Sequence, residues 1–198
     1  MVLLNEPKIL GPISIPQAYQ ICEDITKSAS TSFLRSFKSL PLEKRCSVHA
    51  LYAFCRKVDD IVDGDWLPNL SNLNAKDLSS LNERAEYRSI ALAIERMSEP
   101  VNDDKSHFQR VRALLWFRDN LDSIEKNMPV NHPIFIALED TMKKFPIRIS
   151  DLKLLIEGME DDLFPVQCNT WDELRSYCYK VASAVGLILI EIYGYEDR

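Results

Sequence analysis

Apolar side chains recur every three or four residues along most of the chain, which is the repeat of an amphipathic α-helix. The first such stretch follows Ser14, a good helix N-cap residue, and a short helix is predicted to carry Phe33 and Phe37. A long helix is predicted over residues 41–63, with a proline in its first turn and Gly64 at its end. Further helices are predicted over residues 75–97, 103–126, 133–145 and 151–160.

The last predicted helix begins at Thr170, because Thr170 and Glu173 have the spacing of a capping box. Its apolar stripe consists of Leu174, Tyr177, Cys178, Val181, Val185, Ile188 and Ile192. No Asn-Gly or Asp-Gly turn lies between two alternating runs, and the chain has only 5 glycines in 198 residues. These patterns predict an all-α protein with residues 1–198 in a single domain.

Charge and composition narrow the function classes. The chain has 30 acidic and 24 basic residues, a net charge of −6, which argues against an extended nucleic-acid surface. No glycine-rich phosphate loop occurs. The 5 cysteines are interpreted as reduced, buried thiols of a cytoplasmic protein. The most apolar run, residues 181–190, is half of the roughly 20 residues that cross a bilayer, so we expect at most contact with a membrane surface.

The end of the long helix carries an unusual group of charges. At about 100° per residue, Tyr52, Arg56, Asp59 and Asp63 lie on one narrow strip, with Asp60 beside it. The helix is apolar on two sides, so this strip should not simply face bulk water. Like charges one turn apart repel by a few tenths of a kcal/mol, and the helix dipole disfavours anions at this end by about 0.3–1 kcal/mol each. A binding function explains why the sequence tolerates this arrangement.

Two interpretations of the strip are open from the residues alone. Carboxylates one turn apart suit Mg²⁺ or Mn²⁺, because such hard cations bind through one or two carboxylates and share a substrate's phosphates. An arginine one turn earlier suits a diphosphate, which it neutralises directly. The other interpretation is a solvated acidic helix end whose charges pair with lysines.

Segments between residues 19 and 195 resemble, in the right order, the squalene/phytoene synthase family. The run from Tyr52 to Asp63 (YAFCRKVDDIVD) resembles that family's first aspartate-rich motif. Residues 30–33 (STSF), followed by a Leu-Pro pair and the long helix, resemble its N-terminal substrate segment. Residues 157–163, 170–174 and 177–186 resemble its middle region.

This resemblance implies the isoprenoid synthase fold, an all-α bundle around a deep apolar cavity. It implies head-to-head condensation of two identical prenyl diphosphates, farnesyl or geranylgeranyl diphosphate, with Mg²⁺ assisting the loss of one diphosphate. The double bond of the second chain attacks the allylic cation, and the resulting cyclopropyl diphosphate rearranges to a linear hydrocarbon. Such an enzyme serves isoprenoid and carotenoid biosynthesis, and the sequence does not determine whether it uses NADPH.

The resemblance also assigns roles to individual residues. Asp59, Asp60 and Asp63 would hold the metal, and Arg56 and Tyr52 would contact the diphosphate. The implied substrate-binding residues are Ser30, Thr31, Ser32, Phe33, Phe37, Tyr177, Val181, Ala182, Val185 and Gly186. Ala29 stands where relatives often have a polar residue or a histidine. For the last helix, periodicity alone favours ordinary core packing.

The family's second aspartate-rich motif does not occur in this sequence. We interpret the acids Glu157, Glu160, Asp161 and Asp162 as a solvated helix end and not as that second motif. The resemblance therefore implies half of a diphosphate site in a bundle that is incomplete at its C-terminus. The other half would come from a longer chain or a partner, and we expect an apolar groove to be left uncovered.

Other functions stay open at this point. A squalene or presqualene diphosphate synthase would join two C15 chains, where a phytoene synthase joins two C20 chains. A scaffold or assembly protein would keep the fold without catalysis. A generic helical interaction domain is the least specific alternative.

Overall fold

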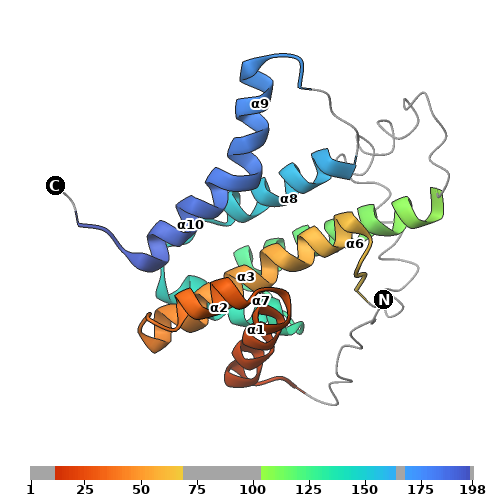
Figure 1. The fold of residues 1–198 in the computed structure, drawn as a ribbon. Helices are drawn as coiled ribbons and strands as arrows, with labels where there is room; N and C mark the ends of the chain where they lie inside the picture. The colour runs from red at the N-terminus through yellow and green to blue at the C-terminus, as the bar shows by residue number, and fades with distance from the viewer. Residues whose placement is uncertain (1–11, 69–103, 164–167, 197–198) are drawn as a thin grey trace.

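The computed structural model describes residues 12–68, 104–163 and 168–196, and all regular secondary structure in these ranges is helical (Figure 1). The elements are α1 (Ile15–Ala29), α2 (Thr31–Phe37), α3 (Leu42–Asp63), α6 (Asp104–Glu125), α7 (Pro133–Lys144), α8 (Ile149–Leu163), α9 (Trp171–Cys178), the π-helical turn η2 (Tyr179–Ser183) and α10 (Ala184–Tyr193). The all-α prediction is confirmed, and the predicted helices match these bounds within a few residues. The helix predicted over residues 75–97 lies outside the described residues.

Local sequence sets where these helices begin and end. Gly64 adopts a left-handed conformation with φ of 81°, which glycine reaches without strain, and its N–H donates to the Ile61 carbonyl. At α9, the Thr170 hydroxyl accepts a hydrogen bond of 3.2 Å from the Glu173 backbone, and the Glu173 carboxylate accepts one from the Thr170 backbone. Both end signals are therefore confirmed.

Helix α3 lies in the middle of the core and packs against α1, α6, α7 and α8. Phe54 of α3, Phe117 of α6 and Phe135 of α7 are fully buried, with ring centroids 5.1 to 6.3 Å apart. Aromatic pairs at such distances add about 0.5–1.5 kcal/mol each beyond the burial of their area. This cluster fixes the direction of α3 and therefore the place of the acidic strip at its end.

The last helix is continuous from Trp171 to Tyr193 but contains the π-turn η2, which the periodicity did not predict. An extra residue in one turn rotates all later side chains, so the predicted apolar stripe is not a single line. Ile188 and Ile192 are buried, whereas Leu174 and Cys178 are exposed. The predicted stripe is therefore buried in the core only in α10. Helix α9 projects from the body of the molecule (Figure 1).

Gly158 allows α8 and η2 to cross closely. A Cβ atom on Gly158 would lie 2.8 Å from Lys180 Cβ and 2.8 Å from Val181 Cγ1, closer than carbon atoms pack. At Gly186 of α10, by contrast, nothing lies within 4 Å of the position of a Cβ. The two glycines therefore offer a matched pair of substitutions, one at a crowded crossing and one in open space.

We expect Gly158→Ala to lower the free energy of unfolding by about 1–3 kcal/mol, because the added methyl group forces α8 and η2 apart. Gly186→Ala should instead raise it by up to about 1 kcal/mol, because alanine is the better helix former. Urea denaturation followed by circular dichroism measures both values. Equal effects of the two substitutions would contradict the close crossing.

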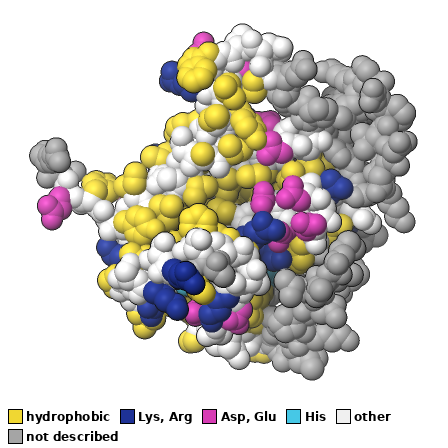
Figure 2. Space-filling view, viewed as in Figure 1, with side chains coloured by type: hydrophobic (Ala, Val, Ile, Leu, Met, Phe, Trp, Pro, Cys, Tyr) yellow, Lys and Arg dark blue, Asp and Glu magenta, His cyan; other side chains and the backbone are white. Residues whose placement is uncertain are grey.

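A broad hydrophobic surface, called here the apolar face, runs over α2, α3 and the helix from α9 to α10 (Figure 2). Exposed large apolar residues of α2 and of the last helix are Phe33, Trp171, Leu174, Tyr179, Ile190 and Tyr193. The predicted exposure of apolar surface is therefore present among the described residues.

The helix Trp171–Tyr193 has 23 residues and is long and apolar enough to cross a membrane. The apolar run of residues 181–190, on which the sequence prediction depended, is too short to cross one and so did not indicate this. The buried Ile188 and Ile192 tie the second half of this helix to the core.

The cysteines fall into two groups. All five are free, and burial raises the pKa of the Cys22 and Cys55 thiols to about 12, which keeps them protonated. Cys168 and Cys178 are exposed, so the prediction of buried thiols is wrong for these two. They lie near or within α9, which has no buried residue.

Candidate active site

The strip predicted at the end of α3 is held together by one arginine. A guanidinium nitrogen of Arg56 lies 3.2 Å from Asp59 Oδ2, and the other lies 2.6 Å from Asp60 Oδ1. Contacts to positions i+3 and i+4 hold the Arg56 side chain along the helix surface. Asp63, the last residue of α3, is exposed. Arg56 and the three carboxylates therefore lie together at this helix end.

Asp60 differs from its neighbours in burial. Its side chain is 10% exposed, against 45% for Asp59. Its second oxygen accepts from Lys57 Nζ at 3.1 Å, and that ammonium group lies 4.8 Å from the centroid of the Trp66 ring. Both oxygens of Asp60 are therefore engaged by cations, and this residue fixes Arg56 and Lys57 in place.

The surroundings of Asp59 raise the pKa of its carboxyl group. Burial is the largest cause, the charge of Asp63 is the next, and the charges of Asp60 and Asp162 add to it against the lowering effect of Arg56. Because Asp162 belongs to the end of α8, acids from two helices act on one another here. Figure 2 shows acidic side chains gathered at one edge of the apolar face. Because these surroundings disfavour the ionised form of Asp59, a cation bound nearby would stabilise it.

The interpretation of the acids at the end of α8 as a solvated helix end holds for Glu157 and Asp162, which are exposed, but not for Glu160, which is largely buried against Arg118. Lys180 Nζ of η2 lies 2.8 Å from a carboxylate oxygen of Glu157 and 2.8 Å from one of Asp161. Asp162 accepts a hydrogen bond of 2.6 Å from the Tyr177 hydroxyl, which raises the pKa of Tyr177 to about 12. These contacts tie the last helix to the end of α8, beside Asp59.

Aromatic rings of α2 pack on Tyr52 of the strip. The Tyr52 ring centroid lies 5.5 Å from that of Phe33 and 6.4 Å from that of Phe37. Ser30 Oγ accepts from the Phe33 backbone and caps α2, and burial raises the pKa of Tyr52 while Arg56 and Ser30 act against it. Phe37 is buried, and Phe33 is 54% exposed at the surface. The structure therefore brings Ser30, Phe33 and Phe37 to the strip.

The predicted substrate residues of the last helix are not core residues within the described chain. Val181 and Val185 are half-buried, Ala182 is exposed, and a Cβ at Gly186 would meet open space. Ordinary core packing therefore explains only the later part of this helix. Thr31 and Ser32 form the first turn of α2, where Ser32 is exposed.

The carboxylates present suit a hard cation that a substrate helps to bind. Among the residues that the structure describes, no three His, Cys, Asp or Glu side chains converge as a complete metal site. Mg²⁺ commonly takes one or two protein carboxylates and completes its coordination with substrate phosphates and water. Asp59 and Asp63, one turn apart where charge is concentrated, fit that pattern.

Carboxylates and an arginine lie on one strip of a helical bundle, at the edge of an apolar face, as the resemblance to an isoprenoid synthase implies. The chain belongs to the squalene/phytoene synthase family, whose sequence profile matches residues 26–198. It is 28% identical over 192 residues to a phytoene synthase from Arthrospira platensis, which covers 97% of this chain and 49% of that protein. It is 27% identical over 180 residues to a phytoene synthase from Mycobacterium tuberculosis, 91% of this chain and 46% of that protein. The chain thus spans about half the length of the curated relatives that it matches.

Solved structures support the same fold. A dehydrosqualene synthase crystallised with a ligand has a TM-score of 0.64 and 26% identity, covering 90% of this chain and 48% of that one. A squalene synthase from Alicyclobacillus acidocaldarius has a TM-score of 0.65 and 22% identity, covering 94% of this chain and 55% of that one. The predicted family and the predicted fold class are both confirmed.

Sequence reasoning missed two residues that shape the site. Arg118 of α6 binds Glu160 of α8 through two hydrogen bonds of 2.8 and 2.7 Å. Lys180 joins η2 to α8, as described above. Their partners lie 42 and 19 positions away in Glu160 and Asp161, so no spacing within one helix could have indicated them.

Proposed function

We propose that this chain supplies the first aspartate-rich half of the active site of a prenyltransferase that condenses two prenyl diphosphates head to head. The observation that carries the proposal is the strip of Asp59, Asp63 and Arg56 at the edge of the apolar face. Membership of the squalene/phytoene synthase family and the relatives named phytoene synthase support this class of reaction.

In this proposal Asp59 and Asp63 bind Mg²⁺ or Mn²⁺, which supplies positive charge to the leaving diphosphate. Arg56 donates to oxygens of the same diphosphate, in exchange for its contact with Asp59. Asp60 keeps its two ion pairs and holds Arg56 on the strip. We therefore assign Asp60 a positioning role and narrow the predicted metal ligands to the other two aspartates.

The residues of α2 and of the last helix receive the rest of the substrates. The Tyr52 hydroxyl, whose ring is positioned by Phe33 and Phe37, donates a further hydrogen bond to the diphosphate. Loss of diphosphate leaves an allylic cation, which the ring faces of Phe33 and Phe37 stabilise. The double bond of the second chain attacks that cation, and loss of a proton closes a cyclopropane ring. Two prenyl diphosphates thus give one cyclopropyl diphosphate, one diphosphate and one proton.

The prenyl chains lie along the apolar face in this proposal. The lining residues of the last helix are Tyr177, Val181, Ala182, Val185 and Gly186. The match to relatives named phytoene synthase supports geranylgeranyl diphosphate over farnesyl diphosphate as the substrate. A second helical half, from a longer chain or a partner, covers the face and completes the site. We further propose that the protein acts in the cytoplasm and contacts a membrane surface there, because its proposed substrates and products are lipids.

Binding and turnover both test this proposal. We expect calorimetry to detect binding of a thiolo analogue of geranylgeranyl diphosphate, which resists ionisation, in Mg²⁺ but not in EDTA. Incubation of the protein with Mg²⁺ and either prenyl diphosphate should give a cyclopropyl diphosphate or a condensed hydrocarbon, identified by mass spectrometry. If Mg²⁺ promotes no binding and neither substrate gives a product, the enzyme assignment is wrong and the scaffold alternative stands.

A further inference from the structure

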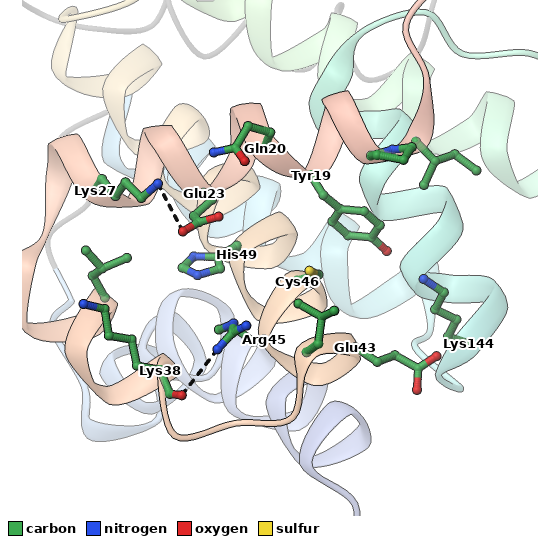
Figure 3. A pocket seen from close by; sticks show the side chains of 14 residues that line it. Tyr19, Gln20, Glu23, Lys27, Lys38, Glu43, Arg45, Cys46, His49 and Lys144 are labelled. Carbon is green, nitrogen blue, oxygen red and sulfur yellow. Dashed lines mark hydrogen bonds and ion pairs between the residues drawn. The ribbon is translucent and has the colours of Figure 1, made fainter.

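A cavity lies near the N-terminal end of α3, whereas Asp59 and Asp63 lie at its C-terminal end. It has a volume of about 1130 Å³ and lies between α1, α2, the start of α3 and the end of α7 (Figure 3). Arg45, which lines the cavity, and Asp59 are 14 positions apart on one helix, so they are separated by about 20 Å along its axis. The residues that line the cavity include none of Arg56, Asp59 and Asp63, so it is separate from the acidic end of the proposed site.

The cavity is cationic although the chain as a whole is acidic. Lys27, Lys38, Arg45 and Lys144 line it against two carboxylates, those of Glu23 and Glu43, in a chain of net charge −6. Figure 3 shows these side chains arranged around one hollow. A local excess of positive charge in a concave site attracts anions.

Two of the four cations already have acidic partners. Lys27 Nζ lies 3.1 Å from Glu23 Oε1, and Lys144 Nζ lies 2.6 Å from Asp140 Oδ2. Within residues 12–68, 104–163 and 168–196, no carboxylate forms an ion pair with Lys38 or Arg45. In the described part of the chain, the Arg45 guanidinium group donates one hydrogen bond, to the Lys38 backbone carbonyl at 3.4 Å. The guanidinium fork of Arg45 and the ammonium group of Lys38 are therefore available to an anion.

A buried histidine in the same wall points independently to a ligand. His49 is 2% exposed, and its Nδ1 has no hydrogen-bond partner among the described residues. Its ring lies between Glu23 and Arg45 in the cavity (Figure 3). Burial is the largest cause of the lowered pKa of His49, and the charges of Arg45 and Lys27 act in the same direction against Glu23. The ring is thus neutral, and a bound group could satisfy the polar atom that the protein leaves unpaired.

We propose that this cavity binds the phosphate or diphosphate end of an amphiphilic molecule, with Arg45 and Lys38 as the main contacts and His49 behind them. Arginine forks match the paired oxygens of phosphate groups. Ile15 and Leu42, which line the cavity and are 45% and 67% exposed, provide an apolar wall for the rest of the ligand. The shared chemistry is a phosphate group next to an apolar chain, either free in solution or in a lipid surface.

Inorganic pyrophosphate in EDTA tests this site without the metal-dependent one. We expect calorimetry to show saturable binding to the 198-residue chain, with a change in the His49 imidazole signals in NMR spectra. Lys38→Gln combined with Arg45→Gln should weaken binding at least tenfold, with circular dichroism confirming the fold. Lys143→Gln, which removes an exposed lysine of α7 outside the cavity, should leave binding unchanged. The proposal is wrong if the chain does not bind pyrophosphate, or if the double variant binds as well as the wild type.

Two further probes distinguish the sources of the phosphate group. Dodecyl phosphate below its micelle concentration represents a soluble amphiphile, and it should bind more tightly than pyrophosphate if the apolar wall contributes. Phosphatidylcholine vesicles with and without phosphatidic acid represent a lipid surface, and co-sedimentation measures their binding. Binding that the Lys38→Gln/Arg45→Gln variant loses in either arm supports the site and identifies the source. Binding that this variant retains in both arms overturns the assignment.

Discussion

Replacement of Asp59 by asparagine should abolish Mg²⁺-dependent binding of a prenyl diphosphate and any turnover, while the helix content stays unchanged. The expected loss follows from the proposed metal pair, because asparagine cannot supply the negative charge that Mg²⁺ requires. Asp63→Asn should have the same effect. Calorimetry with the thiolo analogue measures binding, and mass spectrometry of extracted lipids measures turnover. A variant that binds the analogue normally would remove Asp59 from the metal site.

The same substitution should leave the protein as stable as before or slightly more stable. Burial and the charge of Asp63 raise the native pKa of Asp59 above its unfolded value. The native state therefore holds the proton more tightly, and stability falls as the pH rises through the native pKa. At pH 7 the ionised carboxylate is a net cost, so Asp59→Asn should raise the free energy of unfolding by up to about 0.5 kcal/mol. In urea denaturation this gain should shrink as the pH falls and the wild-type Asp59 takes up its proton.

Asp60→Asn provides the control within the same cluster. Asp60 is the buried partner of Arg56 and Lys57, so its charge is stabilised where that of Asp59 is not. We expect a loss of about 2 kcal/mol in the free energy of unfolding, the range of a hydrogen bond to a charged group. If Asp59→Asn destabilised the fold as much as Asp60→Asn, the whole cluster would be structural.

Loss of the Glu160 charge should be the most damaging substitution for stability among those considered. Arg118 and Glu160 form a bidentate pair between α6 and α8, with side chains 19% and 12% exposed. Glu160→Gln removes the carboxylate that holds two nitrogens of a largely buried guanidinium group, which costs about 3 kcal/mol or more. Arg118→Met/Glu160→Met should cost less than the sum of the single substitutions, because no uncompensated charge remains. Urea denaturation of the wild type and the three variants measures the coupling.

An exposed ion pair of similar length provides the comparison. Lys143 Nζ lies 2.6 Å from Glu139 Oε1, and the lysine side chain is 66% exposed. Glu139→Gln should change the free energy of unfolding by no more than about 1 kcal/mol. Similar values for Glu139→Gln and Glu160→Gln would show that the α6–α8 pair is solvated in solution. Because Glu160 precedes the acids that face Asp59, the buried pair also fixes the end of α8 beside the site.

The acidic strip shows how far sequence reasoning reaches into the site. Residues four positions apart share a face of any α-helix, so the placing of Asp59, Asp63 and Arg56 together needed no tertiary information. That Asp60 would be buried between two cations did not follow, because burial depends on which helices cover each face. The approach of Asp162 toward Asp59 depends on the crossing of α3 and α8 in the same way.

The chain sequence by itself determined the helices, because apolar periodicity, the Thr170 capping box and Gly64 act through neighbours along one segment. It also determined the family, through short segments whose order is a property of the chain. Only the tertiary structure decided the π-turn at Tyr179–Ser183, the Lys180 bridge to α8 and the cationic cavity around His49. Each of these features lies where separate helices contact one another. Such contacts depend on how the helices pack and not on neighbours along one segment.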